Sequence, residues 1–347
     1  MIVKKCCGVH ALRIAVGITM LALLLAGSAN AATLTVCPSG CAYSSIQKAI
    51  NASSNGDIVL VQSGTYFENV NITKQLTLRG IGNPVVDAGG SGSAITLAAN
   101  GITLEGFTAT HSSFDGGAGI VVNSNNNTLT GNNASSNTEN GIYLKYSSNN
   151  TLGGNNVLNN QKGIYQYDSS NNKIYNNIFK NNNNFDFYES NINTWNTTRQ
   201  SGTNIIGGQY LGGNFWANPE GTGFSQTCPD VNGDGICDKS YTLGENNTDY
   251  LPLAKDKIPP KSVRNLKNVS FASSYINWTW KDPKDIDFKK VMVFIDSKFK
   301  KNVSKSKRFF NATNLKANTR HTISTRTVDM NGNINKTWKN SSAWTAK

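Results

Sequence analysis

Residues 230–238, with the sequence DVNGDGICD, hold the side chains whose types and spacing point most clearly to a chemical function. Oxygen ligands would come from loop positions 1, 3, 5, 7 and 9, which are Asp230, Asn232, Asp234, the carbonyl of Ile236 and Asp238. This spacing, with a glycine that allows a sharp turn, is typical of calcium-binding loops. The glutamate expected at position 12 is missing, because Tyr241 stands there. The alternative is a metal-free Asp/Gly turn held by Cys237.

Carboxylates suited to polysaccharide cleavage form a second candidate site. Enzymes of this kind use acidic groups on neighbouring elements as general acid and base. Asp168, Asp186 and Glu189 are the only such cluster near the regular repeats described below. Asp168 falls at an expected turn and Asp186 is expected to point outward, so we interpret the three as solvated structural residues.

Earlier carboxylates have irregular spacing, and the sequence does not align them on one face. An enzyme would be favoured if two of them met Arg79 in one groove. They are Asp57, Glu68, Asp87, Glu105 and Asp115.

Tyr143 and Tyr165 stand at the same outward position of successive repeats. Exposed aromatic rings can bind sugars through apolar face contact, which makes the pair a candidate carbohydrate site. Packing of the two rings across neighbouring strands explains them equally well.

These side chains are positioned by an internal repeat. Three consecutive segments of 22 residues begin GIVV, GIYL and GIYQ, at Gly119, Gly141 and Gly163. A fourth copy begins at Phe185, where the glycine is lost and the register slips by one. A fixed period indicates a solenoid, because each coil must return to the same place on its neighbour. Disordered low-complexity sequence has no reason to keep one.

Each repeat contains short strands rather than helices. Apolar residues alternate with polar ones, which indicates strands with one face inside, and helical spacing is absent. Stacked rungs of this kind describe a parallel β-helix, with Ile120, Ile142, Ile164 and Phe185 stacked in its interior. The predicted fold class is therefore all-β.

Asparagine recurs at equal positions of the repeats. One set comprises Asn127, Asn150 and Asn172, and a second comprises Asn132, Asn155 and Asn177. Asparagine tolerates the left-handed conformation of tight corners, and stacked amides can hydrogen-bond from rung to rung. The alternative is a biased composition without a structural role.

The first residues predict export. Residues 1–31 contain a basic segment, an apolar run at 14–27 and an A-x-A cleavage site, as in a signal peptide. The apolar run is shorter than the roughly 20 residues of a membrane span. We expect a secreted or surface-held mature chain that begins near Ala32 and has no transmembrane anchor.

Four cysteines remain after the predicted cleavage, and three disulfide pairings are possible. The short spacings favour Cys37–Cys41 and Cys228–Cys237 over a zinc site, which would lack nearby histidines. Export would also expose the N-x-S/T sequons to glycosylation. There are 13, at Asn51, Asn71, Asn126, Asn133, Asn149, Asn196, Asn246, Asn268, Asn277, Asn302, Asn311, Asn335 and Asn340.

Charge divides the mature chain. Residues 32–254 hold 9 Lys and Arg against 15 Asp and Glu, whereas residues 255–347 hold 21 against 6. We predict a β-helix over 32–254 with a helical cap at 43–50, a linker at 255–260 and a second domain at 261–347. Outside a cell, the basic domain is expected to meet acidic envelope polymer rather than nucleic acid.

Residues 36–254 resemble the NosD-like, pectate-lyase-like family of right-handed β-helices. The resemblance rests on the segment SIQKAINASSNGDIVLVQSGTY, the GIYL…SSNNT…NN rungs and the terminal GGNFWANPEG…YLPLA. The family includes carbohydrate-binding proteins and sugar hydrolases, and the pattern is similar to surface proteins of methanogenic archaea. Its name also implies copper, but the mature chain offers only His111, His321, Met292 and Met330 as unpaired soft donors.

Residues 261–347 resemble a fibronectin type III domain, with alternating strands at sandwich spacing and Trp278 or Trp280 in the core. His321 replaces the usual tyrosine after the L-x-x-x-T turn, which departs from the pattern.

The leading hypothesis is an exported, non-enzymatic envelope protein that binds carbohydrate or has a structural role. The first alternative is a polysaccharide lyase or glycoside hydrolase of the β-helix class. The second is a structural subunit that self-associates end to end, since a poorly capped solenoid can polymerise.

Overall fold

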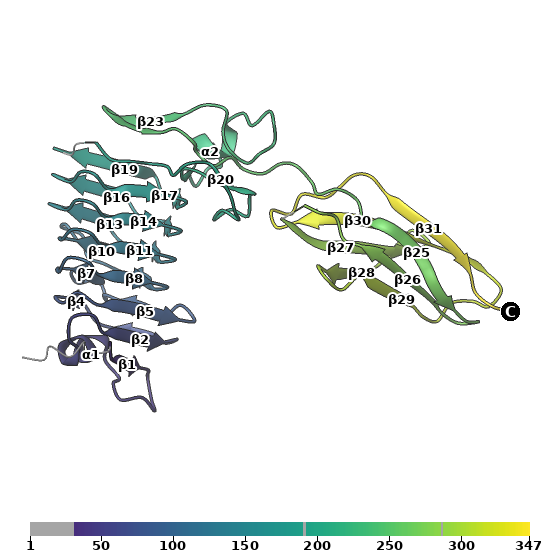
Figure 1. The fold of residues 1–347 in the computed structure, drawn as a ribbon, viewed down its shortest axis with the longest axis horizontal. Helices are drawn as coiled ribbons and strands as arrows, with labels where there is room; N and C mark the ends of the chain where they lie inside the picture. The colour runs from purple at the N-terminus through teal and green to yellow at the C-terminus, as the bar shows by residue number, and fades with distance from the viewer. Residues whose placement is uncertain (1–30, 190–191, 286) are drawn as a thin grey trace, which may run out of the picture. The chain divides into compact units, whose positions relative to one another are not determined.

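The computed structural model describes residues 31–189, 192–285 and 287–347. The predicted signal peptide, apart from Ala31, lies outside the described residues. Nearly all of the regular secondary structure in the described chain is β-strand. It forms a parallel β-helix and then a C-terminal β-sandwich (Figure 1).

The β-helix consists of three parallel sheets, to which successive strands contribute in turn. Sheet A contains β1 (Thr33–Val36), β2 (Ile58–Gln62), β5 (Thr77–Ile81), β8 (Thr103–Glu105), β11 (Thr128–Thr130), β14 (Thr151–Gly153) and β17 (Lys173–Tyr175). Sheet B contains β3 (Thr65–Phe67), β6 (Val85–Asp87), β9 (Thr108–Thr110), β12 (Asn133–Ser135), β15 (Asn156–Leu158), β18 (Ile178–Lys180) and β22 (Phe215–Ala217). Sheet C contains β4 (Val70–Ile72), β7 (Ile95–Leu97), β10 (Ala118–Val122), β13 (Asn140–Lys145), β16 (Lys162–Tyr167) and β19 (Asn183–Tyr188). The solenoid makes about seven turns.

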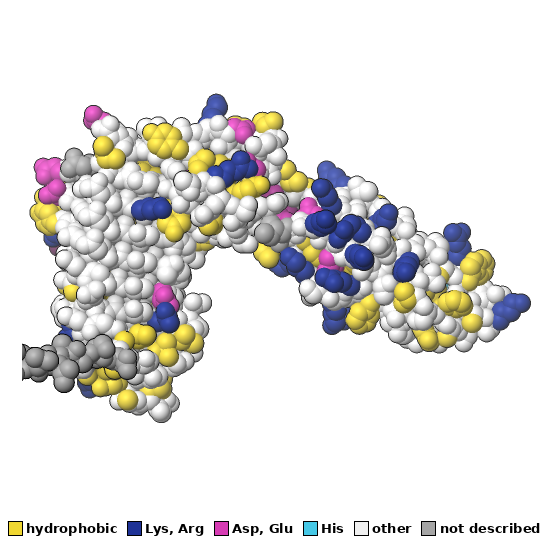
Figure 2. Space-filling model, in the orientation of Figure 1, with side chains coloured by type: hydrophobic (Ala, Val, Ile, Leu, Met, Phe, Trp, Pro, Cys, Tyr) yellow, Lys and Arg dark blue, Asp and Glu magenta, His cyan; other side chains and the backbone are white. Residues whose placement is uncertain are grey.

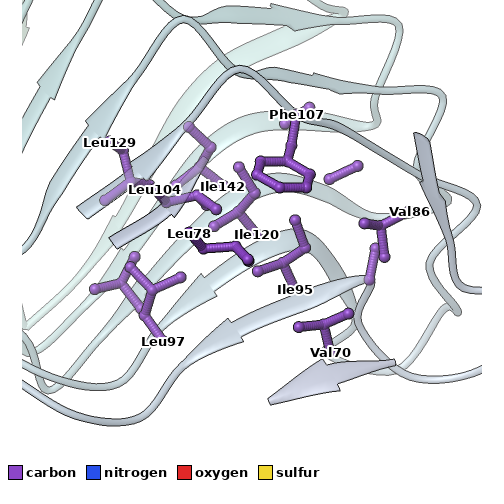
Figure 3. Packing of buried hydrophobic residues seen from close by; sticks show 14 of the residues in the cluster. Val70, Leu78, Val86, Ile95, Leu97, Leu104, Phe107, Ile120, Leu129 and Ile142 are labelled. Atoms are coloured by element: carbon purple, nitrogen blue, oxygen red, sulfur yellow. The ribbon is translucent and has the colours of Figure 1, made fainter. Parts of the chain in front are cut away.

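The interior stack predicted from the repeats is confirmed. Ile120 pairs with Ile142, Ile142 with Ile164, and Ile164 with Phe185 along sheet C. The three isoleucines are at most 1% exposed, whereas Phe185 is partly buried at the C-terminal end of the stack. Leucine, valine and phenylalanine side chains from all three sheets fill the remaining interior (Figure 3).

The glycine that opens each repeat is required by close backbone approach. A Cβ on Gly141 would lie 2.8 Å from the carbonyl oxygen of Gly163, and one on Gly163 would lie 2.6 Å from the carbonyl oxygen of Asn184. Such distances leave no room for a side chain, so the repeated glycine is explained by packing rather than by turn geometry.

A short helix lies at the N-terminal end of the β-helix (Figure 1). Helix α1 (Ile46–Ala52) begins and ends slightly later than predicted and is capped by Ser45. Glu68 accepts hydrogen bonds from the backbone N–H groups of Ile46 and Gln47, at 2.9 and 3.0 Å. This carboxylate therefore stabilises the helix N-terminus.

Tryptophans close the interior at the C-terminal end. Trp195 and Trp216 are at most 1% exposed, and Phe179 stacks on Trp216 with a centroid distance of 4.8 Å. The covering elements are β20 (Gln200–Ser201), β21 (Tyr210–Leu211), α2 (Phe224–Thr227), β23 (Tyr241–Gly244) and β24 (Asn247–Asp249). Both predicted disulfides, Cys37–Cys41 and Cys228–Cys237, are present.

The C-terminal sandwich packs two antiparallel sheets around its own core. The sheets contain β25 (Arg264–Phe271), β26 (Ile276–Lys281) and β29 (Phe309–Ala312), and β28 (Lys298–Ser304), β27 (Phe288–Ile295), β30 (Arg320–Asp329) and β31 (Lys339–Trp344). Trp278 and Trp280 are both buried in this core. The two antiparallel sheets are consistent with the β-sandwich predicted from the sequence. The assignment of this domain to the fibronectin type III class stays a prediction.

Candidate functional site on the β-helix

Buried asparagines form hydrogen-bonded ladders along the solenoid, as predicted. In the first ladder the Nδ2 groups of Asn127 and Asn150 donate to Oδ1 of the next rung's asparagine, at 2.8 and 3.0 Å. The same Oδ1 atoms accept the backbone N–H groups of Asn127 and Asn150, both at 2.9 Å. The ladder continues from Asn172 to Asn193. Each amide thus satisfies a backbone group that the corner leaves without a strand partner.

The second ladder runs from Asn132 through Asn155 and Asn177 to Asn214. It ends on Asp249, whose Oδ2 accepts the backbone N–H of Asn214 at 2.8 Å and the indole N–H of Trp216 at 2.9 Å. Burial raises the pKa of Asp249 to about 7, and the donated hydrogen bonds act in the opposite direction. The groups that hydrogen-bond to this side chain are all donors.

A third ladder escaped the sequence analysis. It joins Asn137, Asn160, Asn181 and Asn184 through the same amide contacts, at 3.0 to 3.1 Å. Asn137, Asn160 and Asn181 follow members of the second ladder by four or five residues. A search for that shorter interval would have found them.

The left-handed corners belong to neighbouring residues. Asn126, Asn149 and Asn171 have φ angles of 60°, 60° and 56°. Each directly precedes a member of the first ladder. One asparagine of each adjacent pair therefore adopts the left-handed conformation, and the next one forms the amide hydrogen bonds between rungs.

Tyrosines form a strip on the outer surface of sheet C. Tyr143 and Tyr165 stack with a centroid distance of 4.9 Å, which confirms their predicted alignment. A second column contains Tyr146, Tyr167 and Tyr188, with centroid distances of 5.0 and 5.1 Å. We call these five residues the tyrosine strip. Tyr146 and Tyr188 are 58% and 50% exposed, so the second column offers most of the accessible ring surface.

A charge pair accompanies the strip. Lys162 contacts Asp186 at 2.8 Å, and its ammonium lies 4.6 Å from the centroid of the Tyr165 ring. The hydrogen bond with Asp186 raises the pKa of Lys162. Burial raises the pKa of Tyr143 to about 12, and a hydrogen bond with Tyr146 raises that of Tyr167 to about 12. The phenols are neutral near pH 7 and can both donate and accept hydrogen bonds.

The three weak catalytic candidates have different surroundings. Asp186 pairs with Lys162, while Asp168 and Glu189 are exposed at positions with φ of 44° and 51°. Within residues 31–189, 192–285 and 287–347, the one set of three acidic or metal-binding side chains with oxygens inside 4.8 Å lies elsewhere. That set belongs to the C-terminal domain and is considered below.

Several of the earlier carboxylates have local partners. Glu105 pairs with Arg79 on the neighbouring strand, but no second carboxylate is paired with Arg79 in the described structure. Asp87 contacts His111 at 2.9 Å, and Asp57 accepts the backbone N–H groups of Ala32 and Ser54. These contacts assign the carboxylates to local structure.

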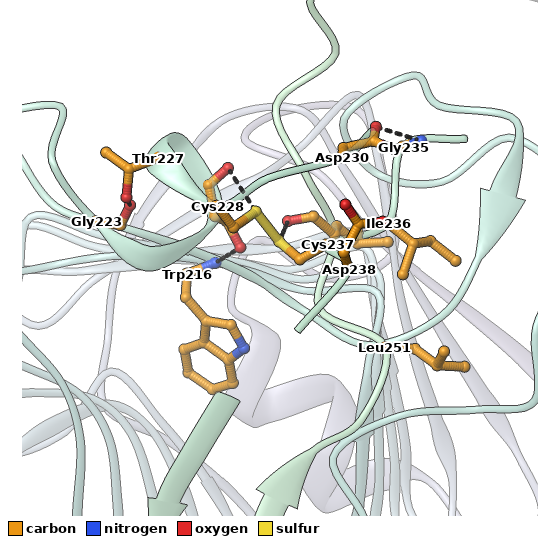
Figure 4. Close-up of a disulfide and its surroundings, with 12 residues drawn as sticks. Trp216, Gly223, Thr227, Cys228, Asp230, Gly235, Ile236, Cys237, Asp238 and Leu251 are labelled. Atoms are coloured by element: carbon orange, nitrogen blue, oxygen red, sulfur yellow. Dashed lines mark hydrogen bonds between the residues drawn. A yellow bond between two sulfur atoms is a disulfide. The ribbon is translucent and has the colours of Figure 1, made fainter. Parts of the chain in front are cut away.

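The aspartate loop at 230–238 folds around its own backbone (Figure 4). Asp230 accepts the N–H groups of Asp234 and Gly235, at 3.1 and 2.9 Å, and Asp238 accepts that of Val231 at 2.9 Å. Arg199 forms an ion pair with Asp234 at 2.9 Å. The loop therefore holds its oxygens in a compact turn without gathering Asp230, Asp234 and Asp238 inside 4.8 Å.

The stacked parallel strands define a β-helix protein, and the comparisons with known proteins place it in a family. The family described as "Periplasmic copper-binding protein (NosD)" matches residues 23–221, more than half of the chain, and the chain belongs to this family.

One curated relative is a cell surface glycoprotein of Methanothermus fervidus, 36% identical over 97 residues. The match covers 26% of this chain and 16% of that protein, so the chain corresponds to about a sixth of the relative's length.

Several solved structures show only a limited likeness. The Clostridium perfringens spore cortex lytic enzyme SleM is 16% identical with a TM-score of 0.24, covering 31% of this chain and 37% of its own. A fibronectin III array of RIM-binding protein is 18% identical with a TM-score of 0.22, covering 26% and 37%. Similarities of this extent define neither the fold nor the function.

The copper of the family description does not fit the side chains present. The matched segment contains one histidine, His111, no methionine, and two cysteines joined in a disulfide. His111 is held by Asp87. Copper sites in proteins need several nitrogen or sulfur donors together, and the donor set of this β-helix does not supply them.

No helix in the described ranges is both long and apolar enough to pass through a bilayer.

Proposed function

We propose that this protein is a non-enzymatic envelope protein whose β-helix binds carbohydrate along the tyrosine strip. The family and the surface glycoprotein relative fit a surface or structural role. The observation that carries carbohydrate binding is the double column of tyrosines on successive rungs, with Tyr146 and Tyr188 half exposed. Half-exposed rings offer apolar edges, and neutral phenols offer hydrogen bonds, which together match the mixed surface of a sugar.

The polar surroundings of the strip support binding rather than cleavage. Asp186 is neutralised by Lys162, so neither side chain is poised to take a proton from a substrate. Amides and phenols do not titrate near neutral pH and seldom act as general bases. A sugar on the strip would be held without an acid–base pair.

The sandwich would attach the protein to acidic envelope polymer. Residues 255–347 hold 21 Lys and Arg against 6 Asp. Figure 2 shows many of these basic side chains on the visible face of the domain, whereas the visible flank of the β-helix is largely uncharged. Attraction of this kind is weakened by salt, because exposed charges are screened.

Glycosylation is part of the proposal. Asn126 and Asn149 begin N-x-T sequons and are exposed at left-handed corners. The amides that stabilise the interior are those of the following residues, Asn127 and Asn150. A glycan on the exposed partner would leave the ladder intact.

Calcium binding at residues 230–238 also remains a proposal. The side chains of Asp230, Asn232 and Asp234 already face the loop backbone, which leaves oxygen acceptors grouped in one turn. Calcium prefers such oxygen ligands. A chelator should lower the melting temperature of the β-helix, and the Asp234→Ala variant should not respond. An equal melting curve for the native protein with and without chelator would remove this part of the proposal.

A glycan array combined with an activity screen tests the function. The purified protein should bind carbohydrates on the array, while releasing no reducing or unsaturated ends from a panel of acidic and neutral polysaccharides. Turnover that disappears on replacement of Glu105 or Asp186 would make the protein an enzyme and overturn the proposal. Absence of binding to every carbohydrate would refute the role of the tyrosine strip.

A further inference from the structure

Three carboxylates converge in the C-terminal domain. Asp256 lies in the segment before β25, Asp287 directly precedes β27, and Asp329 ends β30. Oxygens of the three side chains lie within 4.8 Å of one another. Asp287 is 7% exposed and Asp329 is fully buried. We call these residues the aspartate cluster.

No basic side chain in the described parts of the chain forms an ion pair with the cluster. Among the described residues, the sandwich's ion pairs join Asp282 to Arg308 and Asp296 to His321. Three of the six acidic residues in 255–347 instead face one another, although this segment holds 21 Lys and Arg. Like charges at this distance in a buried site repel strongly, so the arrangement requires a proton or a cation.

Asp287 receives a hydrogen bond only from its own backbone N–H among the described residues. No N–H or O–H of another described residue donates to its carboxylate, and the side chain within hydrogen-bonding reach is the carboxyl group of Asp256. Two residues before Asp287, the Oδ2 of Asp285 is buried without a hydrogen-bond partner. Unpaired buried acceptors are costly unless something else satisfies them.

Amides hold the other two carboxylates in place. The side chain of Asn333 donates to Asp329 Oδ2 at 2.8 Å, and its backbone N–H donates to Asp329 Oδ1 at 2.7 Å. Asn331 and Asn333 also approach Asp256 Oδ2, at 3.3 and 3.4 Å. Such outer contacts orient carboxylates toward a common point, as around bound metals.

We propose that Asp256, Asp287 and Asp329 bind a calcium ion, and that the ion fastens the segment before β25 to the sandwich. The donors are all oxygens, which suits a hard cation. The ion would neutralise the repulsion within the cluster and satisfy Asp287. Because Asp256 belongs to the segment that leads into the domain, calcium would hold that segment against β27 and β30. The proposed ligands include no residue of the 230–238 loop or of the tyrosine strip.

Hydrogen exchange with calcium chloride or with a chelator tests the proposal on the whole protein. Calcium should slow amide exchange at least tenfold in peptides covering residues 256–262 and 328–335. In Asp287→Asn this protection should disappear. Asp282→Asn serves as a matched control, since it lies in the same domain outside the cluster.

Melting temperatures measured with a chelator present distinguish a bound cation from a proton shared by the carboxylates. Asparagine has nearly the shape of aspartate but no charge, so Asp287→Asn should raise the melting temperature of the calcium-free sandwich. Calcium at 100 times its dissociation constant should raise the melting temperature of the native sandwich by about 10 °C or more. The melting temperature of the variant should not change. Equal exchange with calcium and with chelator in the native protein would overturn the proposal. Protection that survives in Asp287→Asn would do the same.

Discussion

Replacing Asn155 with alanine tests whether the asparagine ladders stabilise the β-helix. Asn155 is 1% exposed, and its Nδ2 donates to the carbonyl of Leu129 and to Oδ1 of Asn177, both at 2.9 Å. Its Oδ1 accepts the backbone and side-chain N–H groups of Asn132, at 3.0 and 3.1 Å. The substitution removes four hydrogen bonds at the centre of the second ladder.

The cost follows from the groups left behind. The backbone N–H of Asn132 and one of its amide protons would remain buried without acceptors. Each unsatisfied buried group costs about 1–3 kcal/mol, so the free energy of unfolding should fall by about 4 kcal/mol. Asn123→Ala is a matched control, because Asn123 is exposed and lies outside the ladders. Its effect should stay within about 0.5 kcal/mol.

Urea unfolding followed by pulsed hydrogen exchange measures the effect. Peptides from β11 to β17 report on the β-helix separately from the sandwich, so the two domains need not unfold together. If Asn155→Ala and Asn123→Ala destabilised the β-helix equally, the ladders would be a consequence of composition rather than a source of stability.

Three further changes probe the interior and its C-terminal end. Ile142→Ala should lower the free energy of unfolding by about 2–5 kcal/mol in urea titrations, because it opens a cavity in the central stack, and an effect below 1 kcal/mol would contradict the packing described. Gly213→Ala should cost at least about 3 kcal/mol in the same assay, because its Cβ would lie 1.8 Å from Asp249 Oδ1; a variant as stable as the native protein would refute that contact. Since the folded-state pKa of Asp249 is raised to about 7, the folded chain holds a proton that the unfolded chain loses near pH 4. The stability of the β-helix should therefore fall as pH rises from about 4 to 7 and then level, and unfolding curves of Asp249→Asn should lack this component; an identical pH slope in the variant would assign it to other groups.

The repeat made much of the β-helix predictable. Ile120 and Ile142 are 22 residues apart, and a constant period places equal positions on top of one another. The interior stack, the asparagine ladders and the alignment of the outward tyrosines all follow from this constant period. The short cysteine spacings were informative for a similar reason, since only a local loop separates the partners.

Contacts between distant segments could not be predicted in this way. Asp256 and Asp329 are 73 positions apart and meet only through the folding of the sandwich. Asp249 closes the second ladder from a hairpin outside the repeats, so no periodicity points to it. The roles of Glu68 at helix α1 and of Glu105 beside Arg79 likewise depend on register between irregular early rungs.

The affinity of the tyrosine strip for carbohydrate tests the central claim most directly. Titration calorimetry should compare the native protein with the double variant Tyr146→Ala/Tyr188→Ala, using the polysaccharide bound most strongly on the array. Tyr250→Ala is the control, because Tyr250 is 67% exposed but lies outside the strip. We predict at least a tenfold loss of affinity for the double variant, about 1.4 kcal/mol, and no change for the control. Equal affinity of the native protein and the double variant would contradict the account.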